Sequence, residues 1–405
     1  MVGAGESGRG RVLADVGAGS GRTQTRVRND ASLRAVAIAS LAEIGWDGFN
    51  ARDVARRAGL SYGAVYTRFE HLDELVSTTW SDVLLPRLAD HLHGLVDAVL
   101  DVPDEDRFVE AMGAFAHPSP ELLAAMELIL ASMVDPRAAL FVREDVEALM
   151  AELIGPAARR SPVEATVAAT CAFVATGLLL LSRRSWAKGV DLESELRRYH
   201  RALRSPAEPI ETPRDRVAEF LYLSVFDTED ERLERVLQAT AMSMGELGYH
   251  RTTISRICRI AGVSSGFVMG RFPSKAELFR RITDEMWGRG LAAISEFVAE
   301  NAEEIGPTLA EALAWRKYQN PAIAKIVVLV TETGRLAGFD PEFSAFVEAH
   351  EMEVFSSLSG GGLTAFLHSE YALGNGLPLV AHFFPEVRDL PYPCVTENLV
   401  ATAPH

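Results

Sequence analysis

The sequence predicts a helical protein that contains the same unit twice. A segment of about 36 residues recurs without a gap at an offset of 203 residues, which is half of the 405-residue chain. Within this segment apolar residues recur at helical spacing, and capping residues and glycines stand where helices begin and end. With 48% hydrophobic and 24% charged residues, the composition is that of a soluble globular chain.

The internal repeat aligns residues 40–75 with residues 243–278. Thirteen aligned positions are identical: Ser40/Ser243, Glu43/Glu246, Gly45/Gly248, Arg56/Arg259, Ala58/Ala261, Gly59/Gly262, Ser61/Ser264, Gly63/Gly266, Val65/Val268, Arg68/Arg271, Phe69/Phe272, Glu74/Glu277 and Leu75/Leu278. A period near 200 residues indicates two copies of a whole unit rather than a solenoid. Further along, Gly177 in GLLLL corresponds to Gly376 in GLPLV at an offset of 199.

Domain boundaries follow from the repeat and from a proline-rich connector, SPAEPIETP, at residues 205–213. We expect a flexible basic arm at residues 1–27, a first small helical head at 28–76 and a first helical body at 77–204. The connector is then followed by a second head with a leading helix at 214–280 and by a second body at 281–405.

The first helix of each head carries an apolar stripe and stops at a glycine. In the first head the stripe is Leu33, Val36, Ala37, Ser40, Leu41 and Ile44, before Gly45. A second helix begins after Asn50, whose side chain can cap it, with Asp53 placed for a reciprocal bond. This helix ends at Ala58 and Gly59, and Thr253 is the matching cap in the second head.

The third helix follows a three-residue turn, Gly59-Leu60-Ser61, in which the serine caps the helix. Val65 and Phe69 share its inner face. Tyr62, Ala64, Tyr66, Thr67 and Arg68 point elsewhere, and the small residues Gly63 and Ala64 would allow close approach to DNA in the major groove. The spacing is that of a helix-turn-helix.

The residues from Gly45 to Phe69 and from Thr252 to Phe279 resemble the DNA-binding segment of the TetR family of one-component regulators. The resemblance implies an all-α fold of two tandem TetR-like units, each with a three-helix head and a helical body for ligand binding and dimerisation. The two units are expected to pack as a pseudo-dimer. The implied function is a ligand-responsive transcriptional regulator, expected to act as a repressor, with double-stranded DNA and a small apolar effector as partners and no cofactor.

By this resemblance, residues around the third helices are the expected DNA contacts. In the first head they are Asn50, Arg52, Ser61, Tyr62, Gly63, Ala64, Tyr66, Thr67 and Arg68. In the second head they are Thr252, Thr253, Ser264, Ser265, Gly266, Phe267, Met269, Gly270, Arg271 and Lys275.

The two heads depart from the family pattern in complementary ways. Tyr66 is replaced by Met269 in the second head, and Lys275 is replaced by Leu72 in the first. Residues 235–281 have a net charge of +6, whereas residues 26–75 have none. We expect the N-terminal arm, which contains four arginines and is followed by Arg28, to help the first head by lying in the minor groove; the alternative is an idle leader.

The bodies offer candidate interface helices and candidate ligand contacts. Apolar segments at Val167 to Leu181 and Gly362 to Val380 are expected at the interface of the two units, with ordinary core helices as the alternative. Because the third helices differ, the operator is expected to be asymmetric, with half-sites about 34–36 Å apart or a multiple of it. Candidate ligand-binding residues, which could equally fill the core, are Met112, Phe115, Met126, Phe173, Trp287, Trp315 and Tyr318.

Other classes of protein are disfavoured by composition and motifs. A net charge of −16 requires any DNA-binding surface to be local, and three scattered cysteines exclude a disulfide framework and indicate small buried side chains. We expect a cytoplasmic protein, because no signal peptide is evident and the apolar run at 167–181 is short for a membrane span. No catalytic or metal-binding motif appears, so an enzyme is not expected.

A scaffold or co-regulator with one or two degenerate heads is the main alternative. Met269 and Gly270 in the second head, and Glu70, Asp73 and Glu74 after the third helix of the first, are what this alternative would contain. Salt-dependent binding to DNA distinguishes it from a DNA-binding regulator.

Overall fold

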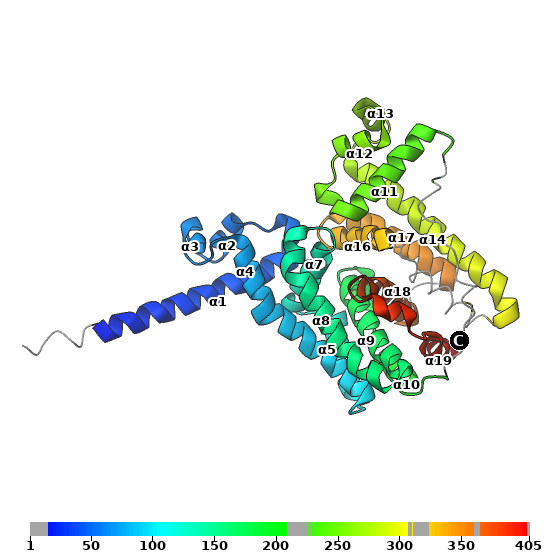
Figure 1. Ribbon diagram of the computed structural model, residues 1–405, viewed down its shortest axis with the longest axis horizontal. Helices are drawn as coiled ribbons and strands as arrows, with labels where there is room; N and C mark the ends of the chain where they lie inside the picture. The colour runs from blue at the N-terminus through cyan, green and yellow to red at the C-terminus, as the bar shows by residue number, and fades with distance from the viewer. Residues whose placement is uncertain are drawn as a thin grey trace, which may run out of the picture.

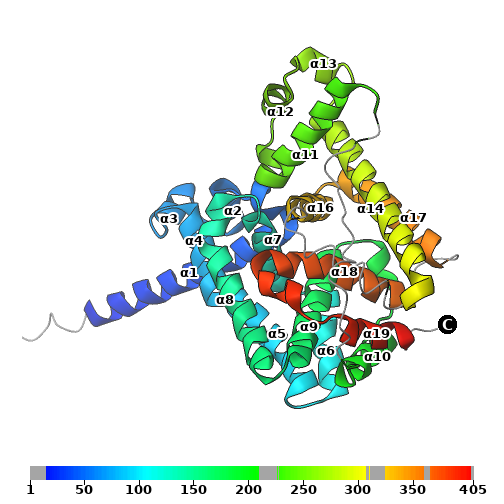
Figure 2. The ribbon, with the colours of Figure 1, turned by 45° about the vertical axis from the view of Figure 1, so that its right-hand side comes forward.

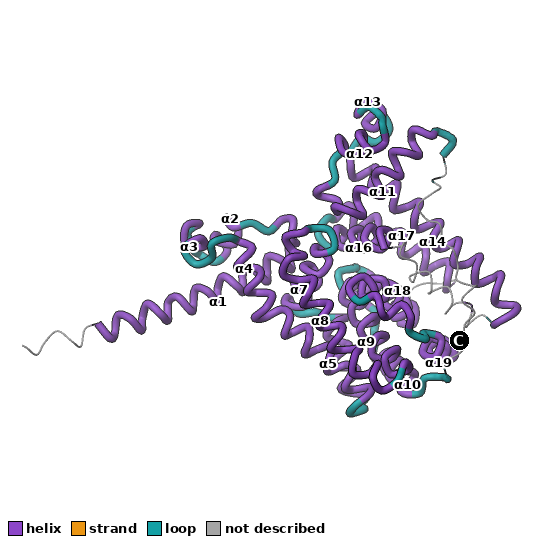
Figure 3. Tube along the Cα trace, viewed as in Figure 1, coloured by secondary structure: helices purple, strands orange, loops and turns teal. Residues whose placement is uncertain are grey.

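The described part of the chain consists of helices joined by short loops, without strands (Figure 3). The computed structural model describes residues 15–208, 226, 228–306, 310, 324–359 and 365–402. The first half contains α1 (Asp15–Gly48), α2 (Ala51–Arg57), α3 (Tyr62–Tyr66), α4 (Leu72–Thr79), η1 (Trp80–Leu84), α5 (Leu85–Leu100), α6 (Glu105–Ala116), α7 (Pro120–Ser132), α8 (Pro136–Arg160), α9 (Pro162–Leu181), η2 (Trp186–Gly189) and α10 (Glu193–Arg204).

The second half repeats this plan. Its helices are α11 (Glu231–Arg251), α12 (Ile254–Ala261), α13 (Ser265–Met269), α14 (Lys275–Ile305), α16 (Ala324–Ala337), α17 (Pro341–Ser359), α18 (Ala365–Phe383), η6 (Pro385–Asp389) and α19 (Pro393–Ala401). The heads, α1–α4 and α11–α13, stand at separate corners of the molecule, and the bodies lie between them (Figure 1). The all-α fold of two tandem units is therefore confirmed.

The two halves pack through the crossing of α9 and α18, which lie together in both views (Figures 1 and 2). A Cβ atom on Gly177 would stand 1.8 Å from the carbonyl oxygen of Ala372, and one on Gly376 would stand 1.7 Å from that of Phe173. Both pairs obey the 199-residue offset of the repeat, so each half presents the same contact to the other. This is the isologous contact of a two-fold dimer, formed within one chain.

One hydrophobic core spans the two halves, because α18 and α19 add their side chains to the core of the first body. The helix α9 is apolar on all sides and has the length and composition of a membrane span, but 89% of that stretch is buried. The expectation of a buried interface helix is thus confirmed. Cys171 and Cys394 pack inside this core as free thiols, and burial raises the pKa of Cys171 to about 12.

The N-terminal arm differs from the expectation. Helix α1 begins at Asp15 and projects from the first head, so residues 15–27 are helical (Figure 1). Extending an existing helix adds one hydrogen bond per residue and avoids the free-energy cost of forming a new first turn, and no proline interrupts this stretch. A helix about 10–12 Å wide is wider than a minor groove of about 6 Å, which disfavours the expected placement for residues 15–27. Residues 1–14 lie outside the described part.

Two of the expected boundaries between head and body lie inside helices. The first boundary, after residue 76, lies inside α4, and the boundary after residue 280 lies inside α14, so no loop separates head from body at either place. Of the connector, residues 205–208 are described, and the N–H of Ala207 donates to the carbonyl oxygen of Cys394 at 2.7 Å. Residues 209–213 lie outside the described part.

Candidate nucleic-acid interface

The helix-turn-helix of each head is built by the same backbone devices. Asn50 accepts from the N–H of Asp53 at 3.0 Å, and Thr253 accepts from the N–H of Arg256 at 3.2 Å, so both predicted caps form. Gly59 and Gly262 follow these helices with left-handed φ angles of 66° and 67°. The hydroxyl oxygens of the N-caps, Ser61 and Ser264, then accept from the first turns of α3 and α13, each at 3.2 Å.

One detail of the second helix differs from the expected capping box. The carboxylate of Asp53 pairs with Arg56 and Arg57 on its own helix rather than with the N–H of Asn50. Two guanidinium groups within one turn outcompete a single backbone donor for this short carboxylate.

Equivalent residues also form the cores of the heads. In the first head the buried residues are Leu33, Ala37, Val54, Ala55, Val65, Phe69 and Leu75. At five of these places, at the 203-residue offset, the second head buries Val236, Ile257, Cys258, Val268 and Leu278. The predicted inner faces of the first and third helices are therefore confirmed. Burial of the inner face of the third helix, α3 or α13, determines which of its side chains face outward; we call these two helices the recognition helices.

The outer faces of α3 and α13 differ in chemistry. Tyr62 and Tyr66 are exposed on α3 with ring centroids 5.0 Å apart, and the Tyr62 hydroxyl donates to that of Tyr66. The equivalent residues of α13, Ser265 and Met269, are also exposed. Gly63, Thr67, Gly266 and Gly270 complete the two exposed faces. The first face offers hydroxyl groups to DNA, whereas the second offers one hydroxyl, a thioether and bare backbone.

Two of the three predicted arginine contacts, Arg68 and Arg271, are held inside their own heads. Arg68 pairs with Asp30 at 3.0 Å and donates to the carbonyl oxygen of Ala64. Arg271 pairs with Asp230 at 2.9 Å, and its guanidinium lies 3.8 Å from the ring centroid of Phe267. Arg68 thus ties the end of α3 to the middle of α1, and Arg271 ties the end of α13 to the N-cap of α11. Their substitution would disturb the fold of the head as well as any phosphate contact.

Two other predicted contacts of the second head point inward. Thr252 is fully buried and donates to the carbonyl oxygens of Ser243 and Gly248, so its side chain cannot reach DNA. The ammonium of Lys275 donates to the carbonyl oxygens of Tyr249 at 2.8 Å and Thr252 at 3.1 Å, and burial lowers its pKa. These donors satisfy carbonyl groups at the C-terminus of α11. Asn50, Arg52, Thr253, Ser61 and Ser264 are exposed at the surface of the heads.

Each head joins the bodies through a buried glutamate. Helix α1 changes direction at Gly45 and α11 at Gly248, both with φ of 71°. The next N–H groups, of Trp46 and Tyr249, donate to the carboxylates of Glu127 on α7 at 2.7 Å and Glu332 on α16 at 2.8 Å. We call Gly45–Asp47 and Gly248–His250 the head junctions. Burial raises the pKa of Glu127, against the opposing effect of the nearby Arg335.

These glutamates were absent from the sequence-based site. A signal did exist, because Glu127 is the one charged residue of LLAAMELILAS, and Glu332 follows the apolar run VVLVT. A charge at a core position of an apolar helix requires a partner. The sequence does not show that the partners are backbone N–H groups of another helix.

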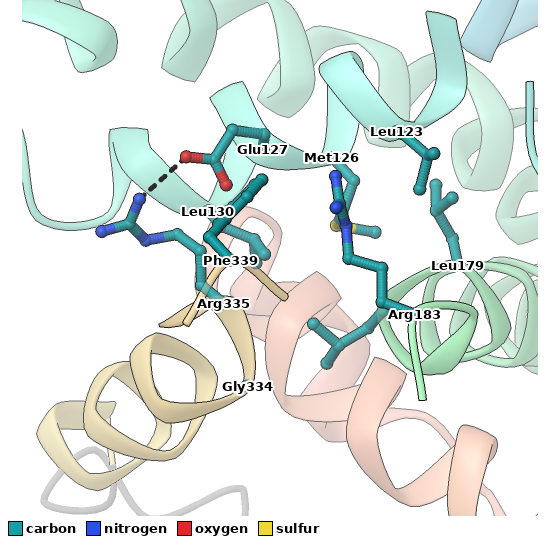
Figure 4. Close-up of a pocket in the computed structure, with 10 residues that line it drawn as sticks. Leu123, Met126, Glu127, Leu130, Leu179, Arg183, Gly334, Arg335 and Phe339 are labelled. Atoms are coloured by element: carbon teal, nitrogen blue, oxygen red, sulfur yellow. Dashed lines mark hydrogen bonds and ion pairs between the residues drawn. The ribbon is translucent and has the colours of Figure 1, made fainter. Parts of the chain in front are cut away.

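The first head junction borders a small cavity of about 20 Å³ that is partly open to solvent (Figure 4). Leu123, Met126, Leu130, Leu179, Leu180 and Phe339 form its apolar wall, and Glu127, Arg183, Gly334 and Arg335 complete the lining. The guanidinium of Arg183 donates to the carbonyl oxygens of Ala42 and Gly338 and lies 4.4 Å from the ring centroid of Phe339. The cavity therefore touches the end of α1 and both halves of the chain.

The expected ligand-binding residues are dispersed. Met126 lines the cavity, whereas Met112, Phe115 and Phe173 are fully buried in the shared core. The ring of Trp287 stacks on His350 with centroids 4.6 Å apart. Trp315 and Tyr318 lie outside the described residues.

Comparison with known families places both heads in one group. The family model described as bacterial regulatory proteins, tetR family, matches residues 33–78 and again residues 236–282. No curated protein matches the chain significantly. The two matched segments are the two helix-turn-helix heads, and the rest of each half forms a helical body. The chain therefore contains two TetR-type DNA-binding heads in tandem, one in each half.

Proposed function

We propose that the chain is a ligand-responsive repressor that binds an imperfect inverted repeat through two non-identical heads. One observation carries the proposal: the heads share caps, left-handed glycines and cores but expose different residues on α3 and α13. Because the two heads share these caps, glycines and cores, they support docking of the third helix of each head, α3 or α13, in the major groove. Different faces favour different half-site sequences, because base edges are read by the side chains that reach them.

The effector site supported best by the geometry is the cavity beside the first head junction. Its apolar wall suits a small apolar molecule, and the site would have to widen on binding, because its space of about 20 Å³ is close to that of one water molecule. Arg183 and Glu127 connect this wall to the carbonyl of Ala42 and the N–H of Trp46. A ligand that displaces either side chain would move the first head and shift the population away from the DNA-binding arrangement.

The test is selection of DNA by the full chain from a random library, followed by footprinting of the selected site at two salt concentrations. We expect protection of two unlike half-sites and a steep loss of affinity with salt, because each phosphate contact adds about 0.9 to the logarithmic slope. The effector is expected to remove protection from both half-sites together.

Two matched variants assign the half-sites. Tyr62→Glu and Ser265→Glu place a carboxylate at the same exposed first position of α3 and α13, where it suits the helix N-terminus but repels phosphates. Each is expected to lose protection of one half-site by tenfold or more, and Val102→Glu, at an exposed site in the body, serves as the control. Loss in the first variant alone would leave the second head as an interaction module. Absence of salt-sensitive protection in the wild type would support the scaffold alternative.

A further inference from the structure

The two head junctions meet each other through equivalent residues. Asp47 and His250 occupy the same place in the repeat, two residues after Gly45 and Gly248. Their side chains approach to 3.6 Å, Nε2 to Oδ2. Equivalent residues that touch mark a two-fold axis, so the pseudo-two-fold axis of this chain passes between Asp47 and His250.

A second pair of contacts places the same axis between the junctions. A Cβ atom on Gly45 would stand 2.9 Å from the ring of Phe339, and one on Gly248 would stand 2.9 Å from the side chain of Val134. Phe339 and Val134 are themselves related by the 205-residue offset that relates Glu332 to Glu127. Each junction therefore packs against the body of the other half.

One guanidinium group joins both junctions. Arg335, on α16 and 4% exposed, donates to Glu332 at 2.7 Å, to Glu127 at 2.8 Å and to Asp47 at 2.5 Å. Glu127 accepts the N–H of the first junction and Glu332 accepts that of the second. By pairing with both glutamates and with Asp47, Arg335 of the second body links the first head to the second junction. The nearby carboxylates raise the pKa of Arg335 despite its burial. We call Asp47, Glu127, His250, Glu332 and Arg335 the axis cluster.

The axis cluster departs from the two-fold symmetry that the other described contacts between the halves follow. The residue equivalent to Arg335 at the 205-residue offset is Leu130, and Asp47 is matched by His250. In a symmetric dimer a residue on the axis faces its own copy, so two carboxylates would meet there and repel. The fused chain instead places a carboxylate opposite a guanidinium and an imidazole, and this arrangement needs two different halves.

We propose that the contact of Asp47 with Arg335 and His250 fixes the separation of the two heads and thereby selects operators by the spacing of their half-sites. The inference rests on the proposed function, because it assumes that both heads bind one DNA duplex. Moving one half-site by one base pair shifts it by about 3.4 Å and rotates it by about 35° around the duplex. Heads held at one separation tolerate such a shift poorly, whereas heads that move independently tolerate it well.

The test uses the DNA selected by the full chain and derivatives with one or two base pairs inserted or deleted between the half-sites. For the wild type we expect each change to weaken binding by about tenfold or more. For Asp47→Ala we expect less than threefold dependence on spacing and unchanged affinity for each isolated half-site. Arg335 keeps two buried carboxylates in this variant, so its charge stays compensated and the chain is expected to fold.

Asp82→Ala is the matched control, since it removes an ion pair of the first head, Arg34 to Asp82 at 2.6 Å, that lies within one half. It should keep the spacing preference of the wild type. Thermal melting of all three proteins shows whether they fold, and Asp47→His provides a second variant that places identical residues on the axis. Undiminished spacing preference in both Asp47 variants would overturn the inference. Failure of the wild type to select DNA would instead refute the proposed function.

Discussion

Single buried polar residues decide how the heads are attached to the bodies. Glu127 and Glu332 are each almost fully buried and each accept the N–H that follows a left-handed glycine. A buried N–H without a partner costs about 1–3 kcal/mol, so these carboxylates hold the change in chain direction at Gly45 and Gly248. Burial tends to raise the pKa of Glu332, but Arg335 and the N–H of Tyr249 outweigh it and the pKa is lowered.

The acid sensitivity of the interface is expected to reside partly in His382 on α18. Burial and the neighbouring Arg143 and Arg388 lower its pKa from 6.5 to about 4. As the pH falls below 6.5, the unfolded chain takes up a proton that the folded chain does not, so folding weakens until the pH nears 4. The loss by pH 4.5 is roughly 2–3 kcal/mol.

Denaturant unfolding of the wild type and His382→Gln between pH 7.5 and 4.5 measures this effect. Glutamine keeps an acceptor for Arg143, which lies 3.4 Å from Nε2 of His382, but does not titrate in this range. The variant should therefore lose less stability than the wild type on acidification. Equal losses in the two proteins would contradict the assignment.

At the scale of elements, the α9 and α18 crossing determines how the halves fit. The backbones approach so closely that no side chain fits at Gly177 or Gly376. The fully apolar surface of α9 provides the hydrophobic driving force, because 17 of its residues from Ala165 to Leu181 are buried. Small residues at the crossing and large ones around it give a single register between the two helices.

Gly177→Ala and Gly376→Ala are each expected to destabilise the protein by about 2–3 kcal/mol or more, since the added methyl group forces the helices apart. Gly94→Ala on α5 is the control, because its Cβ would meet no atom within 4 Å. Alanine at that helical position should raise stability by up to about 1 kcal/mol. Guanidinium unfolding with tryptophan fluorescence compares the three variants, and a neutral Gly177→Ala would disprove the close crossing.

At the scale of the whole molecule, the two halves of the chain complete each other's core. The described core of the first body is completed by α18 and α19 of the second half, so the halves depend on each other for burial. The face that would pair two separate subunits is already covered within the chain. A net charge of −16 further opposes close approach of two copies.

We therefore expect one chain to bind one operator. Sedimentation velocity should show a 44.1 kDa particle without DNA and a complex that contains a single chain with it. A protein concentration series from micromolar upward tests for further association. Two chains per duplex at saturation would contradict this prediction and indicate a second interface elsewhere on the surface.

The sequence by itself determined the repeated heads. Caps at Asn50 and Thr253, left-handed glycines and the stripe that buries Val65 act over three or four residues, and such local interactions are readable as spacing. It also identified the apolar interface helix α9 from composition. The inward turn of Lys275 and Thr252 was not predictable, because their acceptors are carbonyl groups at the end of another helix.

The tertiary structure alone decided how the two heads are joined. Arg335 meets Asp47 across 288 residues of chain, and Asp47 meets His250 where each head junction packs against the body of the other half. The energy of such contacts depends on the separation and burial of charges brought together by packing, which no local pattern records. The chain thus encodes each head locally, whereas the relation between the heads arises from the fold of the whole.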